Sequence, residues 1–260
     1  MYAEWAPPPA LASHACCVWT NAAGSGGHVE RVLPDGCADI VWIGGRLEVA
    51  GPATGPVLAA IAPGTAAVGV RFGPGAAGPA LGVPARELRD RAVDLEVLWG
   101  APAARLAERL RAAPPRRAPL LLAEAVAGRL SAAAQPDRLV AAAAGALERG
   151  ATVAAAGEAV ALGERQLRRR FHDAVGYGPK TLQRVLRLRR FLALAGAGAE
   201  LARAAPEAGY ADQPHLTREC AELAGLPPAA LLASRAAGSA AVAQAAAGSA
   251  SAAGAGRTSP

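Results

Sequence analysis

The sequence predicts an α+β fold: a small, β-rich, barrel-like N-terminal domain precedes an all-α C-terminal domain with two helix-turn-helix units joined by a long helix. The first part of the chain, to about residue 113, is rich in Pro and Gly and contains short apolar runs of strand length. From Leu120 to Leu232 the apolar residues follow helical spacing, with short breaks at Gly or Pro. This change of period along the chain predicts two domains of different class.

The length of 260 residues also favours two compact domains, each large enough to bury its own core. The Pro-rich stretch Ala112–Pro119 cannot continue a helix and is the best candidate for a linker. The predicted division is a β-rich regulatory or dimerisation domain at 1–113, a linker and connecting helix at 114–135, a double helix-turn-helix domain at 136–233, and a disordered Ala/Gly/Ser tail at 234–260.

In the N-terminal domain two apolar runs, Asp39–Ile43 and Ala67–Phe72, have the length and composition of strands. Turn-forming residues lie next to them, at Leu33–Gly36 and at Gly73–Gly75. Towards the end of this domain, residues 83–88 and 103–110 change to helical spacing. We therefore expect some helix to pack on the β-rich domain or to follow it.

Charge is concentrated in one segment of the chain. The formal net charge is +6, and between Gly163 and Arg190 nine basic residues stand against two acidic ones, a net of +7. This segment accounts for the whole excess and favours a polyanionic partner. The four cysteines have neither zinc-ligand nor disulfide-framework spacing, and the chain shows neither a signal peptide nor a membrane-spanning run. A reducing, cytoplasmic setting without membrane contact is expected.

The segment from Gly163 to Val175 has two distinct helical faces. Leu167 and Phe171 lie on an apolar side, and a row of arginines lies on the opposite side. Such a row suits the major groove of DNA, because Arg donates two hydrogen bonds to guanine while its neighbours hold phosphates. With the short helix predicted at Val153–Val160, it forms a helix, turn, helix sequence.

A related arrangement follows about 45 residues later. Leu201–Ala208 has helical spacing, a turn follows, and Asp212 is placed to cap a new helix whose inner side contains Leu216. The segment Pro179–Leu194 between the two units reads as one longer helix with proline in its first turn. Two recognition helices that enter one face of DNA must lie about one helical turn, roughly 34 Å, apart.

Three runs closely resemble the DNA-binding domain of AraC-type transcription regulators: Arg165–Phe171, Val175–Lys180 and Glu207–Glu219. The similarity spans about Pro136 to Leu232. Leu33–Trp42, Val49–Pro52 and Gly69–Gly75 are similar to the N-terminal domain of one subgroup of these regulators. The resemblance implies that base contacts fall on Arg165, Arg168, Arg169, Gln213, Pro214, His215 and Arg218. Arg170, Thr217 and Lys180 are the residues expected to contact phosphate.

The chain departs from the family pattern at several positions. Ala161 stands at a turn where the family has Gly, and Gly163 stands where a cap such as Ser is usual. Pro206 falls inside the first helix of the second unit, where it removes one hydrogen bond at a cost of about 3 kcal/mol and predicts a weakened or kinked unit. Cys220 replaces a larger aromatic residue and predicts a looser core around it.

Other functions receive less support from the sequence. Only His14 and His28 precede the linker and no metal-ligand or hydrolase pattern occurs, so an enzyme, a bound metal and a cofactor are not expected. The alternative to a DNA-binding regulator is a protein-interaction or ligand-sensing module whose DNA binding is weakened. Double-stranded DNA is the expected partner; RNA polymerase, a small-molecule effector and a second copy of the chain are further candidates.

Overall fold

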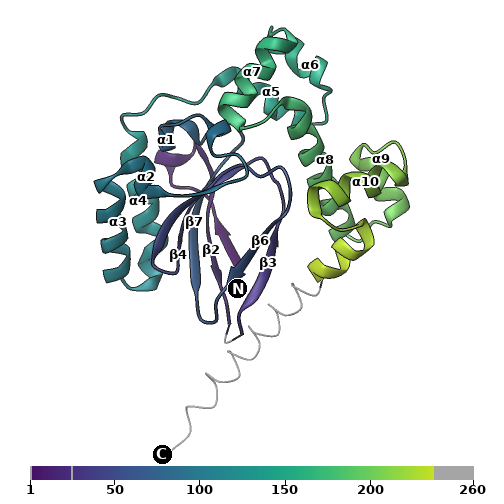
Figure 1. Ribbon diagram of the computed structural model, residues 1–260. Coiled ribbons are helices and arrows are strands. Elements are labelled where there is room, and N and C mark those ends of the chain that lie inside the picture. The colour runs from purple at the N-terminus through teal and green to yellow at the C-terminus, as the bar shows by residue number, and fades with distance from the viewer. Residues whose placement is uncertain (1, 25, 237–260) are drawn as a thin grey trace, which may run out of the picture.

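The structure, a computed structural model, describes residues 2–24 and 26–236. It contains a β-rich N-terminal part and a helical C-terminal part, which confirms the predicted fold class (Figure 1). Within the described residues, eight strands form two antiparallel sheets. The larger sheet contains, in spatial order, β1 (Tyr2–Trp5), β2 (Ala15–Ala22), β7 (Ala66–Phe72), β4 (Ala38–Ile43), β5 (Arg46–Ala50) and β8 (Ala92–Asp94). The smaller sheet pairs β3 (His28–Val32) with β6 (Val57–Ile61).

The two apolar runs expected to be strands are neighbours at the centre of the larger sheet. They form β4 and β7, and Ile40 lies opposite Val70 in the antiparallel register. Both of these side chains are fully buried. On the other face of β7, Gly69 leaves space for the Trp19 ring, because a Cβ atom there would lie 2.2 Å from a ring carbon. The alternation of the two strands thus places one row of side chains in the main core.

Helices cover the core face of this sheet. They are α1 (Gly78–Leu81), α2 (Leu95–Trp99), α3 (Ala101–Ala112) and α4 (Ala118–Leu130), with short 3-10 turns η1 (Pro9–Leu11), η2 (Ala85–Glu87) and η3 (Pro115–Arg117). Figure 1 shows α3 and α4 together beside the sheet. Helical spacing predicted helix at residues 83–88 and 103–110, and the structure has η2 and α3 there.

Helix α4 extends the N-terminal core past the Pro-rich stretch. The side chains of Leu122 and Val126 are fully buried in one cluster with Val70 and Phe72 of the sheet. The sequence assigned residues 114–135 to a linker and connecting helix, but α4 packs on the sheet, with its apolar side chains in the N-terminal core. The predicted domain boundaries themselves stay predictions.

The C-terminal part consists of helices joined by short turns. They are α5 (Arg138–Glu148), α6 (Val153–Glu158), α7 (Glu164–Val175), α8 (Pro179–Gly196), α9 (Leu201–Ala208) and α10 (Gln213–Ala224). A further helical segment covers residues 228–236. It includes residues 234–236, which the sequence assigned to the tail, and Ser234 donates a hydrogen bond to the Leu231 carbonyl within it. The rest of the predicted tail, residues 237–260, lies outside the described residues.

Helix α8 is shared by two separate cores. Leu182 and Leu186 pack in a cluster with α5, α6 and α7, whereas Val185, Leu188 and Phe191 pack in a second cluster with α9 and α10. Its 18 residues span about 27 Å at the rise of an α-helix. The predicted connector is therefore a structural component of both helix-turn-helix units.

Among the described residues, polar contacts join the N-terminal part to the helical part at three places. Arg86 of η2 forms an ion pair with Asp173 of α7. Arg189 of α8 donates to the carbonyl of Asp35 at 3.3 Å, and Arg31 of β3 donates to the carbonyl of Ala224 at 3.0 Å. Both helix-turn-helix units are therefore tied to the β-rich part of the chain.

Candidate nucleic-acid interface

Helix α7 presents its arginines to solvent, on the side opposite its packed face. Leu167 and Phe171 are buried in the first helical core, at 1% and 0% exposure, and they fix the rotation of the helix. Arg165, Arg168 and Arg169 are exposed. The helical period alone produces this separation, since the two sets lie on opposite sides at 100° per residue. No ion pair or hydrogen bond joins these three side chains to other residues that the structure describes.

The next arginine along α7 has a different environment. Arg170 is half-buried and pairs with Asp137, at the N-terminal end of α5. Asp137 also caps α5 by accepting hydrogen bonds from the backbone amides of Leu139 and Val140. Burial opposes ionisation of Asp137, but the bonds from Arg170 and the two amides outweigh it and lower its pKa. Arg170, predicted to contact phosphate, thus connects α7 to α5.

Three further residues affect the charge around α7: His172 belongs to the helix, and Arg89 and Lys180 are basic residues outside it. Burial lowers the pKa of His172, and the positive charges of Arg168 and Arg89 lower it further, so this imidazole is neutral at pH 7. Arg89 is exposed and belongs to the N-terminal part. It lies about 80 positions before α7, so sequence periodicity could not associate it with that helix. Lys180, predicted to contact phosphate, is exposed in the first turn of α8 and donates to the Gln183 side chain at 3.0 Å.

The turn before α7 contains the first departure from the family pattern. Ala161 has φ +52°, in the left-handed region that favours Gly. Gly163 is the N-cap residue of α7, with an ordinary extended backbone (φ −64°, ψ 156°) and no side chain to accept from the first amides. The exchange of residue types therefore places the strained residue in the turn and leaves α7 without a side-chain cap.

The second helix of the second unit, α10, has a side-chain cap. The Asp212 carboxylate accepts a hydrogen bond from the His215 backbone amide at 2.7 Å, as predicted for a cap of α10. Gln213, Pro214 and Arg218 are exposed along the same helix. Thr217 is also exposed, but its hydroxyl donates to the carbonyl of Gln213 at 2.9 Å.

A buried carboxylate connects α10 to α8, and the spacing of residues along the chain did not predict it. Glu219 is 5% exposed, and its Oε1 atom lies 3.2 Å from Arg184 and 3.3 Å from Arg187. His215, predicted to face bases, is half-buried, with its Nε2 atom 3.5 Å from the same oxygen and its ring 5.2 Å from that of Tyr210. The basic residues of α8 that face the second unit are thus used inside the fold.

Pro206 is accommodated within α9 without ending it. The helix runs from Leu201 to Ala208, and Pro206 is exposed on it while Ala204, Ala205 and Ala208 are buried. The proline lies near the C-terminal end of a short helix, so it removes one backbone hydrogen bond and the last turn still forms. Cys220, whose small side chain led us to expect a looser core, is fully buried, and that looseness stays a prediction.

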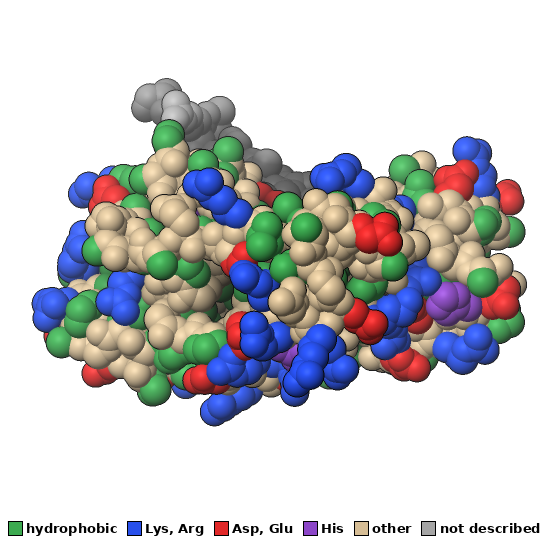
Figure 2. All heavy atoms as spheres, turned by 90° about the horizontal axis from the view of Figure 1, so that it is seen from above, with side chains coloured by type: hydrophobic (Ala, Val, Ile, Leu, Met, Phe, Trp, Pro, Cys, Tyr) green, Lys and Arg blue, Asp and Glu red, His purple; other side chains and the backbone are tan. Residues whose placement is uncertain are grey.

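Figure 2 shows basic side chains gathered along one edge of the molecule, with acidic side chains among them. Within residues 2–24 and 26–236 no cluster of three or more His, Cys, Asp or Glu side chains has the arrangement of a metal site. Over the same residues, no helix has both the length and the apolar character needed to cross a membrane.

Two families match the sequence. Residues 3–94 match a domain of unknown function, DUF6597, and residues 156–234 match a helix-turn-helix domain. Crystal structures of ToxT from Vibrio cholerae are similar in fold, with 10% to 12% identity and TM-scores of 0.42 to 0.43. The similarity covers 83% of this chain and 96% to 97% of theirs. No curated protein matches. By the matched model and its motifs, residues 156–234 form a helix-turn-helix domain of the AraC type, which follows a DUF6597 domain and supports a DNA-binding regulator of transcription.

Proposed function

We propose that the chain binds double-stranded DNA with both α7 and α10 as recognition helices, each in one major groove of the same face. Base contacts are assigned to Arg165, Arg168 and Arg169 in the first helix. In the second they are assigned to Gln213, Pro214, His215 and Arg218. Arg170, Thr217 and Lys180 are the proposed phosphate contacts.

The observation that carries this proposal is the exposure of three arginines on α7 above a buried apolar face. Arginines on a rigid helix reach base edges with little loss of conformational freedom, because the helix is already held by its core. Helix α8 supports both units, so the separation of α7 and α10 is set by packing and not by a mobile linker. A fixed separation is what two half-sites about one helical turn apart require.

The two proposed phosphate contacts of the first unit, Lys180 and Arg170, differ in how free their side chains are. Lys180 is exposed at the start of α8, where a helix N-terminus favours an anion. Arg170 is held by Asp137, so its contact with phosphate requires a shared or exchanged partner. Lys180→Ala is therefore expected to lower affinity for all DNA sequences equally and to reduce the salt slope by about one phosphate contact.

Selection from a DNA pool tests the assignment without knowledge of the operator. The full chain is used to enrich duplexes with a random core of about 40 base pairs, long enough for two half-sites one helical turn apart. We expect a two-part motif. The double variant with Arg168→Ala and Arg169→Ala should lose sequence preference in one half-site of the motif. Each bidentate contact that is lost should weaken DNA binding roughly 5-fold to 100-fold. Combined Gln213→Ala and Arg218→Ala changes remove preference in the other half-site.

A matched control removes the same amount of charge elsewhere. Arg116 and Arg117 are exposed in η3, and their double Ala variant should keep both half-sites. Retained binding of the α7 variant to the full motif would contradict the assignment of α7. Salt-insensitive binding without sequence preference would instead favour a protein-interaction module. RNA polymerase, a small-molecule effector and a second copy of the chain stay proposed partners.

A further inference from the structure

Two cysteines, one in β2 and one in the loop before β4, meet at the end of the central strand β7. Phe72 at this end pairs with Ala15 of β2 on one side and with Ala38 of β4 on the other. Cys16 lies in a bulge of β2, and Cys37 comes just before β4. Gly73 directly follows β7, and a Cβ atom on it would lie 3.2 Å from the Cys16 sulfur. The missing side chain leaves space above Gly73, and there the two thiols hydrogen-bond.

The two thiols differ in access. Cys16 is exposed, and it lines a cavity of about 250 Å³ between the N-terminal part and helices α5 and α8. His14 and Pro74 line this cavity from the N-terminal part, and Glu148 and Leu186 line it from the helices. Cys37 is buried. A small solute therefore reaches Cys16 first.

The surroundings also divide the chemistry between the two sulfurs. The hydrogen bond from Cys37 lowers the pKa of Cys16 to about 7, although burial and the nearby Asp35 oppose this, and Arg189 and Arg71 assist. The same hydrogen bond and burial raise the pKa of Cys37 well above its ordinary value. Cys16 is thus partly a thiolate at neutral pH, the form that reacts with oxidants, while Cys37 stays a thiol.

The other two cysteines lack these features. Cys17 follows Cys16 directly, but it is buried in a cluster with Trp19 and Ala67, and burial raises its pKa to about 11. Cys220 is buried in the core of the second unit, with its pKa raised to about 11 by burial. Both therefore provide reference thiols within the same chain.

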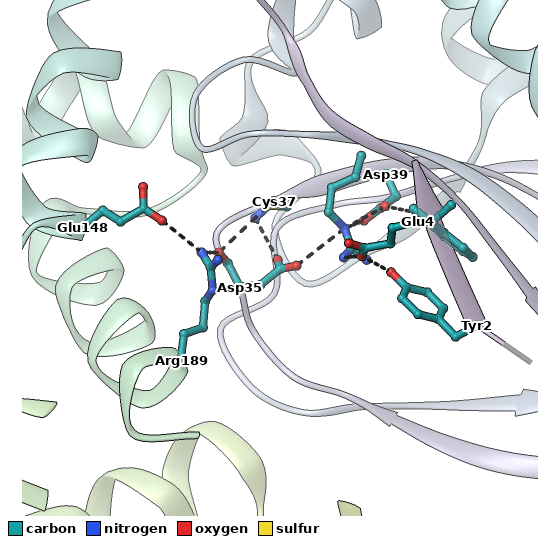
Figure 3. Close-up of polar contacts among 9 residues, drawn as sticks. Tyr2, Glu4, Asp35, Cys37, Asp39, Glu148 and Arg189 are labelled. Carbon is teal, nitrogen blue, oxygen red and sulfur yellow. Dashed lines mark hydrogen bonds and ion pairs between the residues drawn. The ribbon is translucent and has the colours of Figure 1, made fainter. Parts of the chain in front are cut away.

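The loop before Cys37 is the segment that holds α8. The Asp35 side chain accepts from the Cys37 backbone amide at 2.9 Å, and the Asp35 carbonyl accepts from Arg189 of α8 at 3.3 Å. Arg189 also lies 3.8 Å from Glu148 of α5. Figure 3 shows Arg189 between Glu148 and the loop with Asp35 and Cys37. Gly36 fits closely here, because a Cβ atom on it would lie 2.9 Å from Leu182.

We propose that Cys16 is a peroxide-reactive thiol that forms a disulfide with Cys37, and that this bond frees Arg189 of α8 from the loop. The Cys16 thiolate attacks hydrogen peroxide, which breaks the O–O bond; the leaving hydroxide takes a proton to become water, and Cys16 becomes a sulfenic acid. The Cys37 sulfur then displaces the sulfenic hydroxyl, which leaves as a second water with the Cys37 proton. Two electrons pass from the thiols to the peroxide, and a small dithiol restores both cysteines by exchange.

Disulfide formation requires the loop to move. Neighbouring strands lie about 4.8 Å apart, so β2 and β4, on either side of β7, are separated by roughly 9 to 10 Å. A disulfide needs Cα atoms within about 7 Å of each other. We assign this shift to Cys37, because it lies outside β4 while Cys16 belongs to β2, and Asp35, only two residues away, shifts with it. The carbonyl that accepts from Arg189 moves away from α8.

The test uses the full chain treated with stoichiometric hydrogen peroxide and then mapped by peptide mass spectrometry. We expect a peptide pair joined through Cys16 and Cys37, with the loss of two hydrogen atoms. In Cys37→Ser, Cys16 should instead be trapped as a sulfenic acid by dimedone, while Cys16→Ser should show neither product. The proposal would be overturned if dimedone labelled Cys16 no faster than Cys220 after peroxide treatment. A disulfide between Cys16 and Cys17 would also overturn it.

Hydrogen exchange measures the structural consequence without any DNA. Oxidation of the wild type should speed amide exchange in residues 35–37 and in the turns of α8 around Arg189, and a dithiol should reverse it. Peroxide should leave exchange unchanged in Cys16→Ser, which replaces an exposed side chain. A disulfide that forms with no change in exchange would overturn the coupling to α8. Because neither readout involves DNA, failure here is distinct from failure of the proposed recognition helices.

Discussion

The two helix-turn-helix units use their basic residues in opposite ways. In the first, three arginines of α7 are exposed and unpaired among the described residues, and a single half-buried arginine, Arg170, is paired. In the second, Arg184 and Arg187 of α8 converge on the buried Glu219 of α10, and Arg218 is the exposed arginine of α10. The comparison teaches that local charge density alone does not identify a DNA-binding surface. Charges that stabilise the fold must first be separated from charges that remain free.

The units also differ in how their second helices, α7 and α10, begin. Asp212 caps α10 through its carboxylate, whereas α7 begins at Gly163 with no side-chain cap. Conversely, α9 of the second unit contains Pro206, and the corresponding α6 of the first unit has no proline. Each unit thus has one weak point in a different place. Four substitutions test this comparison through the free energy of unfolding.

The largest effect is expected for Glu219→Gln in the second unit. The change removes the negative charge that faces Arg184 and Arg187, and breaking a buried ion pair in this way costs about 3 kcal/mol or more. Urea unfolding monitored by circular dichroism measures the loss. Glu222→Gln is the matched control, since Glu222 is an exposed partner of Arg184 and should change stability by less than about 1 kcal/mol. Equal losses in the two variants would argue against the buried network.

Pro206→Ala should stabilise the second unit. Alanine restores a backbone donor to α9, and proline is about 3 kcal/mol less favourable than alanine inside a helix. The expected gain is somewhat smaller, roughly 1 to 3 kcal/mol, because Pro206 lies near the helix end. Pro214→Ala controls for the loss of ring rigidity: Pro214 lies in the first turn of α10, where proline is well tolerated. A melting temperature raised equally by both changes would contradict the argument.

Asp137→Ala should weaken the first unit by about 1 kcal/mol, through loss of the α5 cap. The effect depends on pH. The Asp137 pKa is lowered in the folded chain, so its stabilisation is complete above the unfolded value of about 3.9 and is lost as pH falls below it. The difference between wild type and variant should therefore be constant from neutral pH to about pH 5 and shrink at more acid pH. If the difference in unfolding free energy between wild type and Asp137→Ala grew as the pH fell, the predicted direction of the pH dependence would be wrong.

The smallest effect is expected for Ala161→Gly. Relief of the left-handed backbone at φ +52° is worth about 1 to 2 kcal/mol, and the greater freedom of Gly in the unfolded chain offsets part of this. A net gain of roughly 0.5 to 1 kcal/mol should appear in thermal unfolding. Ala159→Gly provides the opposite case, because Ala159 has φ −61° and gains nothing from Gly. If Ala159→Gly stabilised as much as Ala161→Gly, backbone strain would not be the cause.

Features that depend on neighbouring positions in the chain could be predicted from the sequence. The amphipathic character of α7, the Asp212 cap and the strands β4 and β7 all agree with the structure, because each depends on a short repeat or a short-range contact. The Glu219 network could not be predicted in this way. It joins residues 32 to 35 positions apart, and no period associates them.

By itself, the sequence determined the class of each half of the chain, the two-unit plan of the helices and the side of α7 that faces solvent. These follow from the spacing of apolar and charged residues, which sets the buried face of each element. Only the tertiary structure decided that α4 joins the N-terminal core, that Arg170 and Arg187 are paired, and that Cys16 meets Cys37 beside α8. Such contacts depend on how whole elements pack against each other, and packing brings together residues that are far apart along the chain.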